Sequence, residues 1–335
     1  MNSIYPWLQM QWTQWNKHVR PLGHAYLLSS PKGIGIEQFV AAVVQKTLCL
    51  HPSTQGACLQ CQGCRLQAGN QHPDFYHLMR LDDKKEMTVE QVRTLVGKLN
   101  ETSHQGGYKV IWIEQVELLN PSAFNALLKT LEEPSPNTLF LLTTSDIGRL
   151  PETIKSRCQQ LNFPPPLLKV AVDWLQQALP QTDLKLIQRA LRLNWGAPLN
   201  ALAWIEGKQF EEDAQWKEGL TQLQQGQKTV SQVVALWLKW PNPVVVFDYF
   251  YLWSVSAVRS VVYATEQNIR LEQGLFLQNS LAFQQATLQA KQCWQGNANK
   301  ELVLETLCLE WLEVQQNPEF FKSVFQSNSQ KGMLS

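Results

Sequence analysis

The sequence predicts an α/β domain with a parallel sheet, followed by all-α regions, because its residue pattern changes along the chain. In the first half, short apolar runs are each followed by a turn and a helix with one apolar face. Buried parallel strands and their crossover helices have this pattern. From residue 208 onward the pattern is helical, with glutamine on the polar faces. Because 335 residues are many for a single core, two or three domains are expected.

The clearest βα unit lies between residues 109 and 134. Its apolar run 110–113 is too short for a helix and apolar on both faces, as in a buried strand. Glu114 follows at the carboxyl end, where open α/β sheets bind their ligands. Asn120 is suited to cap a helix that has Pro121 at its first position. The apolar stripe of that helix consists of Phe124, Leu127, Leu128 and Leu131.

Other elements follow from the same reasoning. Apolar runs predict strands at residues 24–28, 75–79 and 138–144. A helix is expected over residues 38–50. Another begins at a capping box formed by Thr88 and Gln91, and its stripe consists of Val92, Leu95, Val96 and Leu99.

Charge and composition exclude some function classes. The net charge of +1 does not suggest a polybasic surface for nucleic acid. Residues 1–20 lack the charged start and apolar run of a secretory signal, so we expect a cytoplasmic protein with reduced thiols. Residues 244–264 are rich in apolar and aromatic side chains but contain Asp248 and Arg259. Charges are costly inside a bilayer, so this segment is predicted to be a helix buried within the protein.

Four of the seven cysteines form the strongest local pattern. They are Cys49, Cys58, Cys61 and Cys64, and the last three are separated by two-residue spacers. Such spacers let neighbouring thiolates face one tetrahedral centre, which predicts a closed structural zinc site in a module over residues 49–64. The surrounding sequence is polar, so the metal would provide its folding energy. Two rival interpretations are a pair of disulfides, which requires an oxidising compartment, and a redox Cys-x-x-Cys, which uses only two thiols.

Two motifs give the chain a resemblance to a known family. The run 125–134, NALLKTLEEP, and the run 150–158, LPETIKSRC, resemble signatures of clamp-loader subunits, a branch of the AAA+ ATPases. Bacterial members also carry a zinc module after the first helix. The resemblance implies an AAA+-like domain over residues 1–163, a helical lid over 164–207 and a C-terminal helical collar over 208–335.

The nucleotide site that the resemblance implies has lost its working residues. A phosphate-binding loop should lie after the strand at 24–28, but its first glycine is Ser30, its lysine is Ile36 and its hydroxyl residue is Glu37. Active relatives have an Asp-Glu pair where this chain has Glu114-Gln115, and an amide is not a general base. Leu199 stands where they have an arginine, and Thr144 has the place of their γ-phosphate sensor.

These substitutions predict a subunit that binds no ATP. Only Gly33 and Gly35 preserve the loop's turn. The alternative is weak nucleotide binding through backbone amides and the helix N-terminus. Because no nucleotide is expected, Thr144 is expected to have a structural role.

Arg157, in the Ser-Arg-Cys run, is the one catalytic residue that the resemblance implies. In the family this arginine reaches the ATP of the neighbouring subunit and stabilises charge on the transferring phosphoryl group. A guanidinium suits this role because it is planar and permanently charged. An ordinary surface arginine is the alternative. Cys158 is expected to be a buried small residue rather than a nucleophile.

The resemblance therefore implies a DNA-replication role without ATPase activity in the isolated chain, within the assembly of a bacterial DNA-directed DNA polymerase (nucleotidyltransferase) holoenzyme. The implied partners are gamma/tau-like ATPase subunits and a delta subunit, with the sliding clamp and primed DNA reached through the complex and no membrane. Residues 297–310 resemble the last collar helix, whose leucines suit packing. Two other functions remain open: an active motor ATPase and a free-standing zinc-dependent DNA-binding protein.

Overall fold

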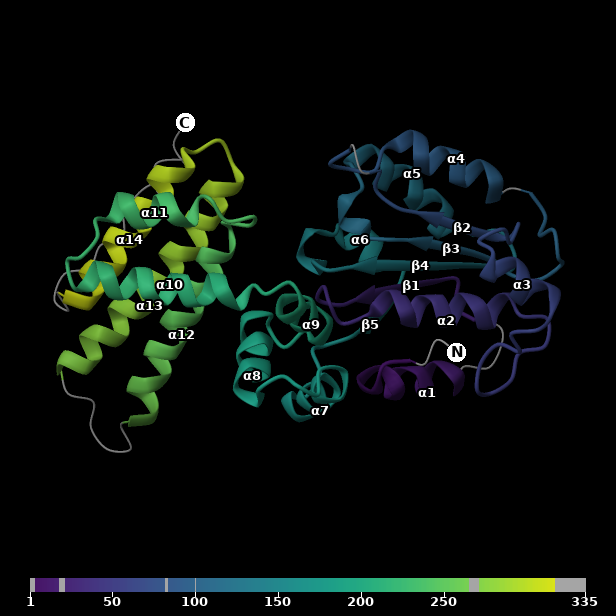
Figure 1. Cartoon of the computed structure of the whole chain (residues 1–335). Coiled ribbons are helices and arrows are strands. Elements are labelled where there is room, and N and C mark those ends of the chain that lie inside the picture. The colour runs from purple at the N-terminus through teal and green to yellow at the C-terminus, as the bar shows by residue number, and fades with distance from the viewer. Residues whose placement is uncertain (1–3, 18–21, 82–83, 100, 265–270, 317–335) are drawn as a thin grey trace. The chain divides into compact units, whose positions relative to one another are not determined.

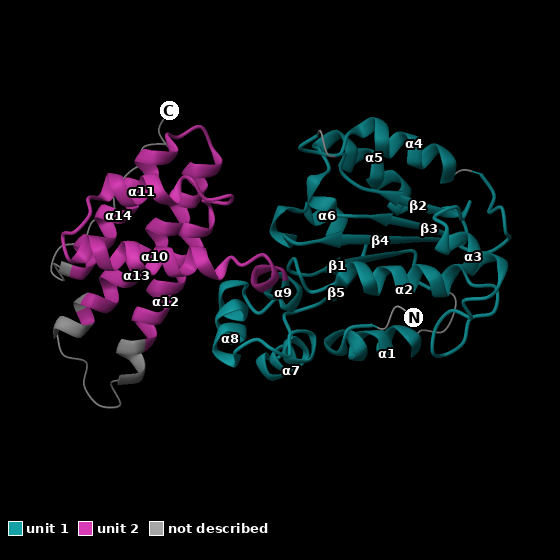
Figure 2. Cartoon of the chain, viewed as in Figure 1, with its two compact units in different colours: residues 1–202 teal, residues 203–335 magenta. Residues whose placement is uncertain are grey.

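Residues 4–17, 22–81, 84–99, 101–264 and 271–316 are described by a computed structural model of the chain (Figure 1). The chain divides into two compact units, residues 1–202 and 203–335 (Figure 2). Unit 1 contains the sheet with its helices, and the described part of unit 2 is helical. The division into domains 1–163, 164–207 and 208–335 stays a prediction.

A parallel sheet is the centre of unit 1, in the strand order β2-β3-β4-β1-β5. This confirms the predicted α/β class. Each expected strand is present within one residue at either end. The strands are β1 (Ala25–Ser29), β2 (Phe75–Leu78), β3 (Lys109–Ile113), β4 (Thr138–Thr144) and β5 (Gln159–Asn162).

Strand β5 was not predicted from the sequence. Its residues read Gln-Gln-Leu-Asn, and most of them are exposed, because β5 is at the edge of the sheet and pairs only with β1 in the described residues. An edge strand with so little apolar surface has no alternation for sequence reasoning to detect.

The two faces of the sheet are covered by different helices (Figure 1). In β1, Ala25 and Leu27 pack with the apolar residues of α4 and α5, whereas Tyr26 and Leu28 pack with those of α1 and α2. Successive side chains of a strand point to opposite faces, so one strand serves both cores. The helices of unit 1 are η1 (Pro6–Leu8), α1 (Gln9–Lys17), α2 (Ile36–Leu48), α3 (Gln62–Ala68), α4 (Val89–Leu99), η2 (Val116–Leu118), α5 (Pro121–Glu132), η3 (Ile147–Arg149), α6 (Glu152–Lys155), α7 (Leu168–Ala178) and α8 (Leu184–Leu193).

Both predicted helix caps are present. The amide of Ala123 donates to the side chain of Asn120 over 2.8 Å, and Pro121 begins α5. Before α4, the amide of Thr88 donates to the side chain of Gln91 over 2.9 Å, and the reciprocal bond is 3.5 Å long. These caps satisfy amides that the first helical turn leaves without partners.

Unit 2 is a helical bundle with an aromatic core. Helix α9 (Pro198–Glu206) crosses the boundary between the units. The helices that follow are α10 (Phe210–Gln224), α11 (Val230–Trp237), α12 (Val245–Ala264), α13 (Leu271–Gln295) and α14 (Lys300–Gln316). Phe250 in α12 contacts the rings of Trp216, Trp237, Phe283 and Trp311, so tryptophans from several helices pack inside this bundle.

The apolar segment predicted to be a buried helix corresponds to α12. Its Phe247, Tyr249 and Phe250 are buried. The carboxylate of Asp248 pairs with the ammonium group of Lys291 in α13 over 2.7 Å. No helix in the described ranges has the length and apolar character needed to cross a membrane.

The apolar residues of α14, whose leucines were expected to pack, divide between the core and the surface. Val303, Leu304 and Leu307 are buried, while Leu302 and Leu309 are more than half exposed. The first three stabilise the bundle itself, and the other two are on its accessible face.

Candidate functional sites: a cysteine cluster, a closed loop and an arginine

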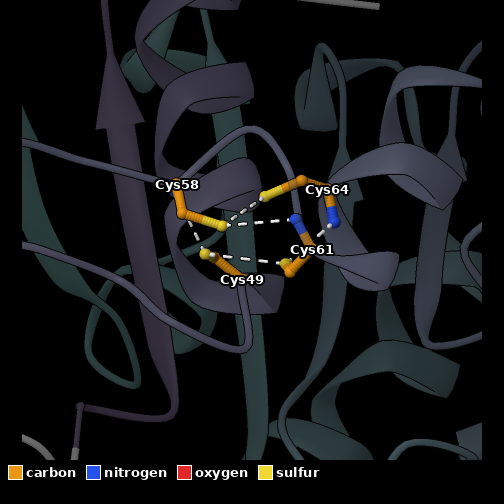
Figure 3. A group of neighbouring side chains, drawn as sticks. All are labelled: Cys49, Cys58, Cys61 and Cys64. Carbon is orange, nitrogen blue, oxygen red and sulfur yellow. Dashed lines mark hydrogen bonds between the residues drawn. The ribbon is translucent and has the colours of Figure 1, made fainter.

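The four predicted cysteines come together where α2 ends and α3 begins (Figure 3). Cys49 caps the carboxyl end of α2, Cys61 caps the start of α3, and Cys64 lies in the first turn of α3. Cys58 completes the group from the intervening loop. Their sulfur atoms all lie within 4.8 Å of one another.

The sulfur spacing fits a metal ion rather than disulfides. Cys49 Sγ and Cys61 Sγ are 3.9 Å apart, and Cys58 Sγ and Cys64 Sγ are 4.0 Å apart. A disulfide would need about 2.05 Å. A tetrahedral ion with metal–sulfur bonds of about 2.3 Å separates its sulfurs by about 3.8 Å. The four thiols could therefore hold one tetrahedral metal ion.

Backbone amides stabilise negative charge on these sulfurs. Cys49 Sγ accepts from the amide of Cys58 at 3.2 Å, and Cys61 Sγ accepts from the amides of Leu50 and Cys64, each at 3.4 Å. Burial alone would raise the pKa of Cys61, but these bonds lower it to about 6. Backbone amides also lower the pKa of Cys58, whereas burial raises the pKa of Cys49 and Cys64. A metal ion that binds all four thiolates must therefore displace protons from the two buried thiols.

Close backbone packing fixes the cluster against α2, and a glycine permits it. A Cβ atom added to Gly63 would lie 2.4 Å from the carbonyl oxygen of Leu48. We expect Gly63→Ala to lower the free energy of unfolding by about 1–3 kcal/mol, because one of the two helices must move.

Gly97→Ala in α4 is the matched control, since the added methyl group meets no heavy atom within 4 Å among the described residues. It should raise the free energy of unfolding by about 0.5–1 kcal/mol, because glycine disfavours a helix interior. Urea denaturation of the metal-loaded protein measures both variants. Equal stability of Gly63→Ala and the wild-type chain would contradict the close approach of α3 to α2.

The loop between β1 and α2 turns through Gly33 and Gly35, both at positive φ, and neighbouring side chains fill most of the space beside it. The cavity beside it measures about 30 Å³ and is lined by residues of the loop, of the β3 end and of the β4 end. This is close to the volume that one water molecule occupies in the liquid. Ile36, at the position of the missing lysine, lines this cavity but is 7% exposed and packs with the core, so it brings an apolar group and no cation to the cavity.

Two segments cover the loop's glycines. A Cβ atom on Gly33 would lie 2.3 Å from the Asn200 side chain, and one on Gly35 would lie 2.3 Å from the Tyr5 ring. The amide of Leu199 donates to the carbonyl of Gly33 over 3.1 Å. The loop's backbone is thus hydrogen-bonded to α9 and covered by the N-terminal segment. Neither contact was predicted from the sequence.

An aromatic cluster fixes the N-terminal segment that contains Tyr5 and Trp7. The rings of Tyr5 and Trp7 stack with centroids 4.9 Å apart, and both meet Trp174 edge to face. Trp7 Nε1 donates to the carbonyl of Ile34, in the loop, over 2.9 Å. The N-terminal segment therefore contacts both α7 and the loop.

Glu114, which follows the carboxyl end of β3, also has a partner within the chain. Glu114 Oε2 lies 3.2 Å from His77 Nε2, and the His77 ring stacks on Trp112 with centroids 4.2 Å apart. Gln115 adopts a left-handed backbone conformation with φ of 51°. Thr144 is buried, and its hydroxyl accepts from the amide of Asp146 over 3.1 Å, a contact that fits the expected structural role.

Arg157 lies between α6 and β5, and its side chain is about one-third exposed. Its Nη2 atom is 2.5 Å from Glu132 Oε1, at the end of α5. Sequence reasoning missed this pair. Cys158, the next residue, packs against the core, and burial raises its pKa to about 12, which disfavours a nucleophilic role.

Comparisons with known proteins identify what the chain is similar to. A family model described as DNA polymerase III, delta subunit, matches residues 9–167. The DNA polymerase III subunit delta' of Pseudomonas aeruginosa is 35% identical over 323 residues, which cover 93% of this chain and 98% of that one. The corresponding subunit of Escherichia coli is 38% identical over 188 residues, or 56% of each chain.

More distant relatives match smaller parts or at lower similarity. The DNA polymerase III subunit tau/gamma of Haemophilus influenzae is 37% identical over 143 residues, which is 42% of this chain and 20% of that protein. A solved gamma subunit-related protein of Thermotoga maritima superposes with a TM-score of 0.43 at 16% identity, covering 92% of this chain and 99% of that one.

Proposed function

This chain belongs to the family of DNA polymerase III delta' subunits, and from that premise we propose that it is a clamp-loader member without its own nucleotide. In the proposed mechanism the chain supplies Arg157 to the ATP site of a neighbouring gamma/tau-like subunit. The delta subunit, the sliding clamp and primed DNA are the other proposed partners, and the cytoplasm is the proposed location. The observation that carries the proposal is the combination of a filled loop with a partly accessible arginine outside that loop.

The filled loop supports the absence of bound ATP. A cavity of about 30 Å³ does not admit a triphosphate, and Glu37 would repel one. The loop's turn remains, but its carbonyls and glycines are occupied by side chains and amides of the same chain. Phosphate binding through the remaining backbone amides would require these covering groups to move away.

Arg157 supports the role in trans. Its guanidinium is partly accessible and lies outside its own chain's loop, so the described structure gives it no catalytic task within this subunit. A planar cation with several donors is suited to stabilise charge on a phosphoryl group in transfer.

Zinc is the proposed ion for the cysteine cluster. Four sulfur ligands, tetrahedral spacing and no open position match a structural zinc site, where the metal stabilises the fold without taking part in chemistry. Cys49, Cys58, Cys61 and Cys64 are the proposed ligands.

Restoring the missing side chains should not restore nucleotide binding. In the Ile36→Lys/Glu37→Thr double variant the lysine and hydroxyl return, but Asn200 and Tyr5 still cover the loop's glycines. We expect neither the wild-type chain nor this variant to bind Mg·ATP saturably below about 1 mM.

A titration of the isolated chain with a fluorescent ATP analogue measures this affinity, and a gamma/tau-like subunit is the positive control. Micromolar binding by the wild-type chain would contradict the proposal and would favour the alternative of an active motor.

A further inference from the structure

The guanidinium of Arg157 is held by groups from two helices. Its Nη2 atom donates to Glu132 Oε1 over 2.5 Å, and its Nη1 atom donates to the carbonyl oxygen of Thr153 over 2.9 Å. A longer bond of 3.4 Å connects Nη1 to the hydroxyl of Ser156. Glu132 is the last residue of α5, and Thr153 lies in α6.

Both helices are fixed to the core next to the residues that hold the arginine. Leu131, adjacent to Glu132, is 1% exposed, and Ile154, adjacent to Thr153, is fully buried. The carboxylate and the carbonyl therefore start from backbone positions that packing determines, whereas an arginine side chain alone has many rotamers. The three bonds select one orientation of the guanidinium.

Part of the guanidinium remains available. An arginine has five N–H donors in a rigid plane. Three of them are used by the bonds above, so two are without partners among the residues that the structure describes. The side chain is 33% exposed, and that of Glu132 is 48% exposed. At such exposure an ion pair is weak, so it can orient the guanidinium without preventing a phosphate from approaching it.

We propose that Glu132 is the positioning residue for Arg157: its carboxylate holds the guanidinium in the orientation in which the remaining donors meet the neighbouring subunit's ATP. The inference rests on the proposed role of Arg157 in trans. Positioning matters because ordering a mobile catalytic group costs free energy, and this cost adds to the activation barrier.

The test uses the reconstituted clamp-loader complex with four test variants and one control variant of this chain. Glu132→Ala removes the acceptor, Glu132→Gln keeps an oxygen that can accept from Nη2, and Arg157→Ala removes the guanidinium. The fourth variant combines Glu132→Ala with Arg157→Ala. Glu133→Ala, which removes the adjacent exposed carboxylate, is the matched control.

We expect Glu132→Ala to lower the single-turnover rate of ATP hydrolysis at the neighbouring site by about two- to fivefold, the range that an exposed ion pair supports. Glu132→Gln should recover most of this loss, and Glu133→Ala should have wild-type turnover. In the double variant, turnover should equal that of Arg157→Ala alone, because Glu132 acts only through the arginine. The assembly affinity and the melting temperature of the isolated chain should be unchanged.

Three possible results separate this inference from the function on which it rests. If Arg157→Ala lowers turnover but Glu132→Ala leaves it unchanged or raises it, Glu132 does not position the arginine, and the role of Arg157 stands. Losses that add in the double variant would overturn the inference in the same way. If Arg157→Ala has no effect, the proposed role in trans is wrong and the positioning role is wrong with it.

Discussion

Arg157→Ala should slow ATP hydrolysis about a thousandfold at the neighbouring site that this subunit serves. An arginine supplied in trans is worth about 10³ or more in rate, or roughly 4 kcal/mol of transition-state stabilisation. Steady-state turnover of the whole complex should fall only by the fraction of total ATP hydrolysis that occurs at this site. Single-turnover hydrolysis at the site therefore measures the effect of the substitution more directly. The complex should still assemble, because the removed side chain is one partly exposed group.

Arg149→Ala is the matched control for that experiment. Arg149 is an exposed arginine in η3, close in the sequence to Arg157, and its loss removes the same charge. Wild-type hydrolysis by Arg149→Ala together with a large loss in Arg157→Ala would assign the effect to the one guanidinium. Equal rates for both variants would contradict the role in trans.

Removal of the metal should loosen residues 49–72 and leave the sheet intact. Structural zinc contributes on the order of 10 kcal/mol to the folding of small tetrathiolate modules. The two cores that cover the sheet are built mainly from residues outside this segment. A strong chelator should release one ion per chain, and hydrogen exchange should then accelerate in the segment while β3 and β4 stay protected. Acidification should also release the ion, because protons compete for the thiolates.

Cysteine variants test the same prediction without a chelator. Cys61→Ser should lose the ion, because Cys61 is one of the four converging thiols. Cys293→Ser should keep it, because Cys293 lies exposed in α13, in the other unit. Global unfolding of the metal-free chain would contradict a local module, and a chain that purifies without any metal would contradict the site itself.

Local patterns made much of the fold predictable. The central strand, the capped helix after it and the cysteine cluster each depend on residues close in the sequence, and all are present. The polar edge strand β5 was missed because its pairing with β1, rather than its own residues, makes it a strand.

The features of the site that were missed are tertiary contacts. Asn200 reaches the carbonyl of Lys32 across 168 positions, and Glu132 meets Arg157 across 25. Neither pair leaves a periodic or spacing signal in one sequence. The lost lysine at Ile36 was visible from the motif, but the side chains that fill the loop were not.

The most direct test of the central claim is to map where ATP lies relative to this chain in the intact complex. An ATP analogue with a photoreactive group on its γ-phosphate would be bound to the complex and irradiated, and the labelled peptides of this chain identified by mass spectrometry. We expect labels in residues 152–158, around Arg157, and none in residues 30–37 of the filled loop. Labels in the loop, with none near Arg157, would contradict the account.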